Sequence, residues 1–191
     1  VACLLASFAP TVFTTEGSGQ VASVSTKFDF VPGDKVVFMD DFAQEELGEF
    51  PARWSLTIGT VEVAEMDGRR WLRCTAADCT VKMKLPAMQS LPEFWTLEFD
   101  FYATEPMGSA LTVRGVNARG QSAWESTYPQ GKNLAFRSGD IFSTTPLEGA
   151  ATPAGHHHVM FMARGPALKV YMDRQRMANV PDVTTTTAGA P

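Results

Sequence analysis

The sequence predicts an all-β protein, folded as a two-sheet antiparallel sandwich of the jelly-roll type. Many short segments alternate apolar and polar residues, and Gly, Pro and Asp turns separate them. No segment shows a convincing helical period. With 45% apolar residues among 191, the chain can bury one substantial core. Short strands joined by such turns are typical of sandwiches and barrels, and a jelly roll fits this length.

The first folded segment contains an apolar and an acidic part. Residues 28–42, FDFVPGDKVVFMDDF, predict a short strand, a Pro-Gly-Asp turn, and a second strand that enters an acidic loop. Trp54 follows this loop and is expected to anchor the core.

A hairpin is expected next. Residues 61–65 alternate, Asp67-Gly68 is a two-residue turn typical of hairpins, and residues 70–74 continue the pattern. Cys74 and Cys79 bracket the following short turn. Because cross-strand neighbours come within disulfide distance, the two cysteines are expected to form a disulfide if the protein is exported.

The remaining chain continues the pattern of strand and turn. Residues 94–103, FWTLEFDFYA, predict a strand with one buried and one outward face. Three adjacent histidines at 156–158 are expected to face solvent or to pack, with His156 and His158 on one face of their strand. Further strands are expected within residues 80–85, 109–120, 133–139, 156–165 and 167–180.

Both ends of the chain differ in composition from this β-rich middle, which spans residues 27–183. Residues 1–26 begin apolar and end rich in Gly, Ser and Thr, which predicts a signal remnant followed by a linker. Lipidation of Cys3 is one alternative, and an ordinary first strand is another. Residues 184–191, TTTTAGAP, predict a linker or the start of further sequence.

Charge and hydropathy exclude two classes of protein. The net charge is −5, with 21 acidic and 16 basic residues. This balance argues against a nucleic-acid-binding protein, which would show a basic patch or stripe. No run reaches the roughly 18 apolar residues that a membrane-spanning helix needs. We therefore expect neither a nucleic-acid partner nor a membrane span in this chain.

Four motifs together resemble one known family. They are DFVPGDKVVFMDDF (29–42), GEFPARW (48–54), DGRRWL (67–72) and LPEFWTLEFDFY (91–102). These motifs resemble the N-terminal concanavalin A/laminin G-like domain of bacterial OmpA-family envelope proteins. VYMDRQR (170–176) is similar to a later hairpin of that fold, with Arg174 where the family usually has Gly.

The resemblance implies an exported protein of the bacterial outer membrane, periplasm or cell surface. It also implies a concanavalin A/laminin G-like jelly roll. That fold normally closes with further strands after the 170–176 hairpin, so the resemblance implies truncation at the C-terminal end. Peptidoglycan would be bound only through a separate domain that these residues do not include.

The acidic loop offers one candidate metal site. Asp40 and Asp41, with backbone carbonyls near Gly48, are oxygen ligands of the kind that calcium prefers. A solvated loop is the simpler interpretation. If calcium binds here, we expect a structural role, and no other cofactor is expected.

Glu98 and Asp100 are the candidate catalytic residues. Their spacing of two places both carboxylates on one face of a strand, as in family 16 glycoside hydrolases, which share this fold. The next acid, Glu105, has odd spacing and precedes Pro106. The strand therefore does not supply the third carboxylate, and an outward polar face is the favoured interpretation.

Trp124 and Tyr128 are the candidate ligand-binding residues. They lie in a polar, loop-like stretch, where exposed aromatic rings can stack on sugars. Core packing is the alternative, and it is favoured for Trp54 and Trp71. The sequence thus predicts a non-catalytic envelope module that recognises a glycan or another envelope protein. A structural spacer and a family 16-like glycoside hydrolase are the alternatives.

Overall fold

The computed structural model describes residues 28–85, 91–103, 111–116, 120–130, 133–146 and 155–181. Within these residues the chain forms twelve strands and no helix. The strands are β1 (Trp54–Ile58), β2 (Val61–Met66), β3 (Arg69–Cys74), β4 (Thr80–Met83), β5 (Phe94–Ala103), β6 (Leu111–Val116), β7 (Ser122–Gln130), β8 (Asn133–Ser138), β9 (Ile141–Pro146), β10 (Gly155–Arg164), β11 (Ala167–Met172) and β12 (Gln175–Val180).

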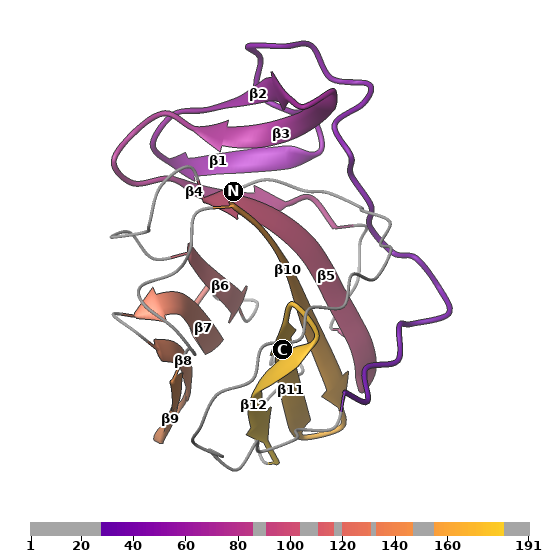
Figure 1. The fold of residues 1–191 in the computed structure, drawn as a ribbon, viewed down its shortest axis with the longest axis vertical. Helices are drawn as coiled ribbons and strands as arrows, with labels where there is room; N and C mark the ends of the chain where they lie inside the picture. The colour runs from indigo at the N-terminus through magenta and orange to yellow at the C-terminus, as the bar shows by residue number, and fades with distance from the viewer. Residues whose placement is uncertain are drawn as a thin grey trace, which may run out of the picture.

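Two four-stranded antiparallel sheets form the body of the molecule (Figure 1). One has the order β12-β11-β10-β5, and the other is the meander β6-β7-β8-β9. Their facing sides enclose the main core, in which Phe136, Phe161, Leu168 and Val170 are almost fully buried. This arrangement confirms the predicted all-β antiparallel sandwich.

A smaller layer sits at one end of the body and contains the two-stranded sheets β1-β4 and β2-β3 (Figure 1). Its own core is built around Phe42, Val61, Val63 and Leu72. The predicted hairpin turn joins β2 to β3, with positive φ at both central residues, Asp67 (53°) and Gly68 (70°). Such a turn matches the twist of the strands that it joins.

The pairing of β5 with β10 sets the two faces of the first sheet. Phe99 lies opposite Val159, and Asp100 lies opposite His158. Because side chains alternate along a strand, the odd-numbered residues of both strands face the main core. The even-numbered residues, including Glu98 and Asp100, project from the outer face of the sheet.

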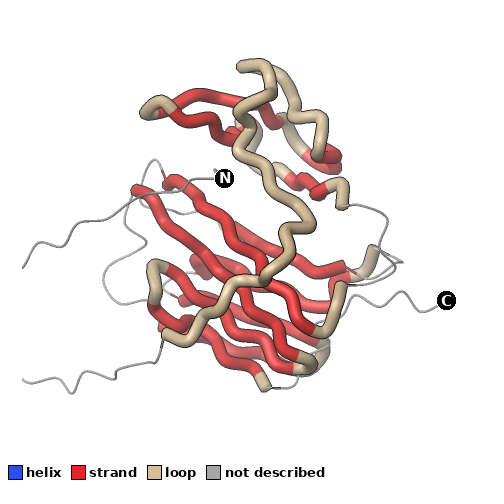
Figure 2. Tube along the Cα trace, turned by 90° about the vertical axis from the view of Figure 1, so that its right-hand side faces the viewer, coloured by secondary structure: helices blue, strands red, loops and turns tan. Residues whose placement is uncertain are grey.

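The opening segment corrects one prediction, because residues 28–42 form no strand. Residues 28–33, which we call the strap, instead cross the outer face of β10 and β11 (Figure 2). Phe28 and Phe30 pack edge-on against Tyr171, with ring centroids 5.4 and 5.8 Å away. Pro32 lacks the N–H that a sheet ladder requires, so side-chain contacts replace strand pairing here.

Several predicted segments lie outside the described residues. They are the signal remnant and linker at 1–26, including Cys3, and the C-terminal linker at 184–191. In the part of the chain that the structure describes, no helix is long and apolar enough to cross a membrane.

Candidate functional site

The main polar group on the outer face of the first sheet comes from two neighbouring strands. Glu98 and Asp100 lie on β5, and His156 and His158 lie on β10. We call these four residues the His–carboxylate cluster. The antiparallel register brings them together, because His158 is directly opposite Asp100, and His156, two pairs further along, lies on the same face.

Asp100 is the centre of the cluster. Its side chain is only 3% exposed, and its Oδ1 lies 2.6 Å from His158 Nδ1 and 3.3 Å from His156 Nε2. His158 Nε2 lies 3.4 Å from Glu98 Oε2. A buried carboxylate needs partners to offset its lost hydration. The two histidines supply these partners for Asp100. Glu98, in contrast, has a side chain that is 40% exposed to solvent.

The turn between β11 and β12 fixes the start of β10. Asp173 Oδ1 accepts the backbone N–H of His158 at 2.9 Å, and the backbone N–H of Asp173 donates to His158 O at 2.9 Å. Asp173 Oδ2 also lies 2.7 Å from Nδ1 of the buried His157, whose ring stacks on Phe101. These contacts hold the backbone on which His156 and His158 are mounted.

The contacts shift two pKa values. The hydrogen bond to Asp100 is the main cause of the raised pKa of His158, and Glu98 adds to it, while burial acts in the opposite direction. Burial alone would raise the pKa of Asp173. Its hydrogen bonds with the His157 ring and the His158 amide outweigh burial, so the pKa of Asp173 lies below its ordinary value.

Aromatic residues border the cluster. The Trp71 ring, from β3, lies edge-to-face with both Tyr102 (6.0 Å) and His156 (6.5 Å). Trp71 is buried, whereas Tyr102 is half-buried. The exposed part of the site therefore consists of imidazole and carboxylate edges beside one partly open tyrosine ring.

The cluster can exchange hydrogen bonds with a ligand, and an imidazole lies between its two carboxylates. In a retaining glycosidase, two carboxyl groups about 5–5.5 Å apart flank the sugar bond. Here the imidazole of His158 contacts both Glu98 and Asp100, so it fills the space between the two carboxylates. Asp100 is also covered by its histidine partners.

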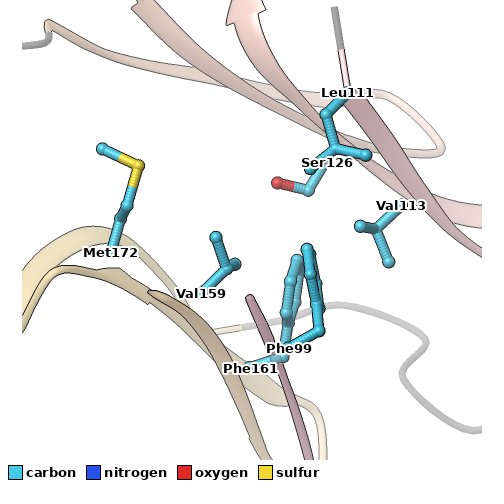
Figure 3. Close-up of a pocket in the computed structure, with 7 residues that line it drawn as sticks. All are labelled: Phe99, Leu111, Val113, Ser126, Val159, Phe161 and Met172. Atoms are coloured by element: carbon cyan, nitrogen blue, oxygen red, sulfur yellow. The ribbon is translucent and has the colours of Figure 1, made fainter. Parts of the chain in front are cut away.

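The interior cavity between the two sheets is no alternative site (Figure 3). Its volume is about 10 Å³, which is the space for roughly one water molecule. Apart from Ser126, its lining is apolar: Phe99, Leu111, Val113, Val159, Phe161 and Met172. This cavity is a small packing gap in the core.

The prediction of an exposed platform at Trp124 is wrong. Trp124 lies in β7 and is only 3% exposed. Its ring stacks on Trp95 at 5.7 Å and contacts Phe161 at 5.5 Å. Polar residues around Trp124 suggested a loop, but the buried Ser126 occupies a core-facing position and conceals the alternation of the strand. Tyr128 also lies in β7, and its side chain falls outside the described residues.

The predicted calcium ligands act as turn-forming residues. Asp40 Oδ1 accepts the Phe42 N–H at 3.0 Å, and Asp40 Oδ2 accepts the Trp54 indole N–H at 2.9 Å. Asp41 Oδ1 accepts the Ala43 N–H, and the Gly48 N–H donates to Val63 O. Across residues 28–85 and the later described ranges, no group of three or more His, Cys, Asp or Glu residues has a geometry that could hold a metal ion.

Cys74 and Cys79 form a disulfide in the structure, with a Cα–Cα distance of 6.0 Å. It joins the end of β3 to the residue before β4. The connection that carries the disulfide packs closely against Gly59. A Cβ at residue 59 would lie 2.1 Å from Asp78 O and 2.9 Å from Cys79 Sγ.

Sequence reasoning missed the histidine–carboxylate contacts. His158 and Asp100 are 58 residues apart, and Asp173 is 15 residues beyond His158. The available signal was the outward alternation of Glu98 and Asp100 together with the shared face of His156 and His158. Only the register between the two strands could join these pairs.

Comparison with known proteins adds support for the fold. No family model and no curated protein match the chain. A solved structure described as a sialidase is similar to this chain, with a TM-score of 0.56 and 16% sequence identity. The match covers 79% of this chain but only 13% of the sialidase chain. At this identity the likeness shows the β-sandwich fold alone.

Proposed function

We propose that this protein is an exported, non-catalytic β-sandwich module that recognises a neutral glycan through the His–carboxylate cluster. The observation that carries the proposal is an ordered set of imidazole and carboxylate edges, partly exposed beside the Tyr102 ring. We further propose that its place is the bacterial cell envelope, as the resemblance to OmpA-family N-terminal domains implies.

The chemistry of the cluster favours a neutral ligand. Carboxylates accept hydrogen bonds, and the hydroxyl groups of sugars can donate them. Glu98 and Asp100 also place negative charge on this face of the sheet. A sialylated or other acidic sugar would meet like charge there, so neutral hexoses are the better fit.

Two further observations support an exported module. A disulfide such as Cys74–Cys79 forms and persists in oxidising compartments. The sandwich also matches a small part of a much longer chain named a sialidase, which is consistent with a module used within larger proteins. We propose an accessory role of that kind.

Glycan binding is testable with a panel of immobilised neutral and sialylated glycans, followed by calorimetry on any ligand found. We expect binding to neutral glycans and little binding to sialylated ones. Glu98→Gln should weaken affinity about fivefold or more, since it removes a charged acceptor worth ~1 kcal/mol or more. Glu65→Gln removes the same charge from an exposed position on β2 and serves as the matched control.

The same panel tests the alternatives. Absence of binding to any glycan would reject glycan recognition and favour a structural spacer, or a module for another envelope protein. Turnover of a polysaccharide that Glu98→Gln abolishes would instead favour a glycoside hydrolase. Equal loss of affinity in Glu98→Gln and Glu65→Gln would mean that the ligand does not bind at the cluster.

A further inference from the structure

One imidazole bridges two carboxylates of very different exposure. His158 Nδ1 lies 2.6 Å from Asp100 Oδ1, and Nε2 of the same ring lies 3.4 Å from Glu98 Oε2. The Asp100 side chain is 3% exposed and the Glu98 side chain is 40% exposed. The ring therefore connects an acid embedded in the sheet surface to an acid that faces solvent.

Only one protonation state of His158 satisfies both contacts. A neutral imidazole carries one N–H, whereas an imidazolium carries two. If the neutral ring donates from Nδ1 to Asp100, its Nε2 presents a lone pair to the Glu98 carboxylate, and the two repel. Both contacts are favourable only when the ring of His158 is protonated.

We propose that protonated His158 cross-links Glu98 to Asp100 and thereby orders the ligand-binding edge of the cluster, so that ligand affinity falls when His158 loses its proton. The ligand part of this inference rests on the proposed function. Holding Glu98 in place in advance reduces the entropy that is lost when a ligand binds. Loss of the proton releases Glu98 into solvent and removes that advantage.

The surroundings of His158 favour this behaviour. The ring contacts the carboxylates of Asp100 and Glu98 on β5, and His156 on the same face of β10 shares Asp100 with it. Tyr102, opposite His156, is the next residue on this face of β5. The carboxylate of Asp173, in the β11–β12 turn, bonds the ring of His157 and the backbone of His158 instead. Asp173 also holds the backbone of His158 through two hydrogen bonds of 2.9 Å. The backbone thus positions the ring, and both of its nitrogens contact carboxylates.

The sign of the effect follows from the raised pKa of His158, which the hydrogen bond to Asp100 causes in the first place. A raised pKa means that the cross-link is fully formed below the ordinary value of 6.5 and is lost as the pH rises through the higher folded-state value. Ligand affinity should therefore be greatest at the acidic side of this transition and weakest at its alkaline side.

Imidazole NMR tests the cross-link without any ligand. We expect His158 in the full chain to titrate above 6.5, and its midpoint to fall in Glu98→Gln because one carboxylate partner becomes neutral. Glu65→Gln, which removes an equal charge elsewhere, should leave the midpoint unchanged. A midpoint at or below 6.5, or one that Glu98→Gln does not move, would overturn the proposal.

Binding of a neutral glycan identified by the panel tests the consequence. Wild-type affinity should fall about fivefold as the pH rises through the His158 transition, which is the loss expected for one ordered hydrogen bond. His158→Gln should bind weakly at every pH in this window, whereas His156→Gln should keep the dependence. A flat wild-type profile would refute the link to binding. Normal His158 titration with no glycan bound would instead reject the proposed function and leave the cross-link standing.

Discussion

At the scale of single residues, Gly115 explains why Trp124 is part of the core. The two residues are directly opposite each other in the pairing of β6 with β7. A Cβ on residue 115 would lie 2.2 Å from Trp124 Nε1 and 2.5 Å from Trp124 Cε2. The indole ring therefore lies across the bare backbone of Gly115, while its other side contacts Trp95. The indole N–H groups of both tryptophans lack a hydrogen-bond partner among the described residues. The two rings therefore contribute to the core by packing.

Gly115→Ala should destabilise the fold by about 1–3 kcal/mol, because the added methyl overlaps a buried ring that has little room to move. Urea denaturation followed by tryptophan fluorescence measures this loss. In the Trp124→Leu background, the same Gly115→Ala change should cost much less. Equal costs in both backgrounds would mean that Trp124 does not determine the need for glycine.

At the scale of elements, local turn chemistry fixes the small layer at the end of the sandwich. Asp67-Gly68 closes the β2–β3 hairpin, and Cys74–Cys79 holds the next connection. Asp173 and Arg174 form a similar turn between β11 and β12, with φ values of 48° and 70°. A non-glycine residue at Arg174 is unusual in this conformation. The guanidinium of Arg174 lies 5.2 Å from the centre of the Phe28 ring, which gives that residue a packing role.

Loss of the Cys74–Cys79 disulfide should lower stability by about 2 kcal/mol, at the low end for disulfides because its loop is short. The double variant Cys74→Ser/Cys79→Ser measures this in chemical denaturation. Cys3→Ser removes a cysteine outside the bridge and is the control. A reducing agent should destabilise the wild type and leave the double variant unchanged; a similar effect on both would contradict a structural role for the disulfide.

At the scale of the whole molecule, the strap connects the start of the described chain to its end. Asp29 accepts the Tyr171 hydroxyl at 2.6 Å and pairs with the Lys169 ammonium, 140 residues away in sequence. The Lys169 hydrogen bond, with that of Tyr171, lowers the pKa of Asp29 from 3.8 to about 2. Burial is the main cause of the raised pKa of the Tyr171 hydroxyl, and Asp29 adds to it.

Asp29→Asn should destabilise the protein by about 1 kcal/mol at neutral pH, since it removes a charged acceptor that solvent partly screens. A lowered carboxyl pKa contributes stability above its unfolded value, and this contribution is lost as the pH falls from about 4 to about 2. Denaturation at pH 7 should therefore show a clear difference in stability between Asp29→Asn and wild type. At pH 2 this difference should be small. Asp34→Asn, at an exposed position nearby, should match wild type at both pH values. A difference that is the same at both pH values would contradict the ion-pair role.

Local patterns predicted the parts of this fold that depend on neighbouring residues. The alternation of residues 94–103 predicted both β5 and the shared face of Glu98 and Asp100, because side chains of a strand alternate with a period of two. The same period placed His156 and His158 together. Asp67-Gly68 predicted its hairpin because these residues tolerate positive φ.

Distant contacts decided the rest. The strap has the composition of a strand. Its backbone does not pair with a neighbouring strand, and its side chains pack across β10 and β11 instead. Trp124 has polar neighbours in sequence, but Gly115 and Trp95 from other strands bury it. In the sequence, Glu98 and Asp100 indicated only an outward polar face. The register of β5 against β10 is what places His158 between them.

The sequence by itself therefore determined the all-β sandwich, the positions of most later strands, the outward direction of Glu98 and Asp100, and the shared face of His156 and His158. These features follow from periodicity and turn chemistry, which act over a few residues. Only the tertiary structure decided that Trp124 belongs to the core, that residues 28–33 form a strap, and that Asp100 is enclosed by two histidines. Those features depend on strand register and on which surfaces meet, and neither is fixed by residues that are close in sequence.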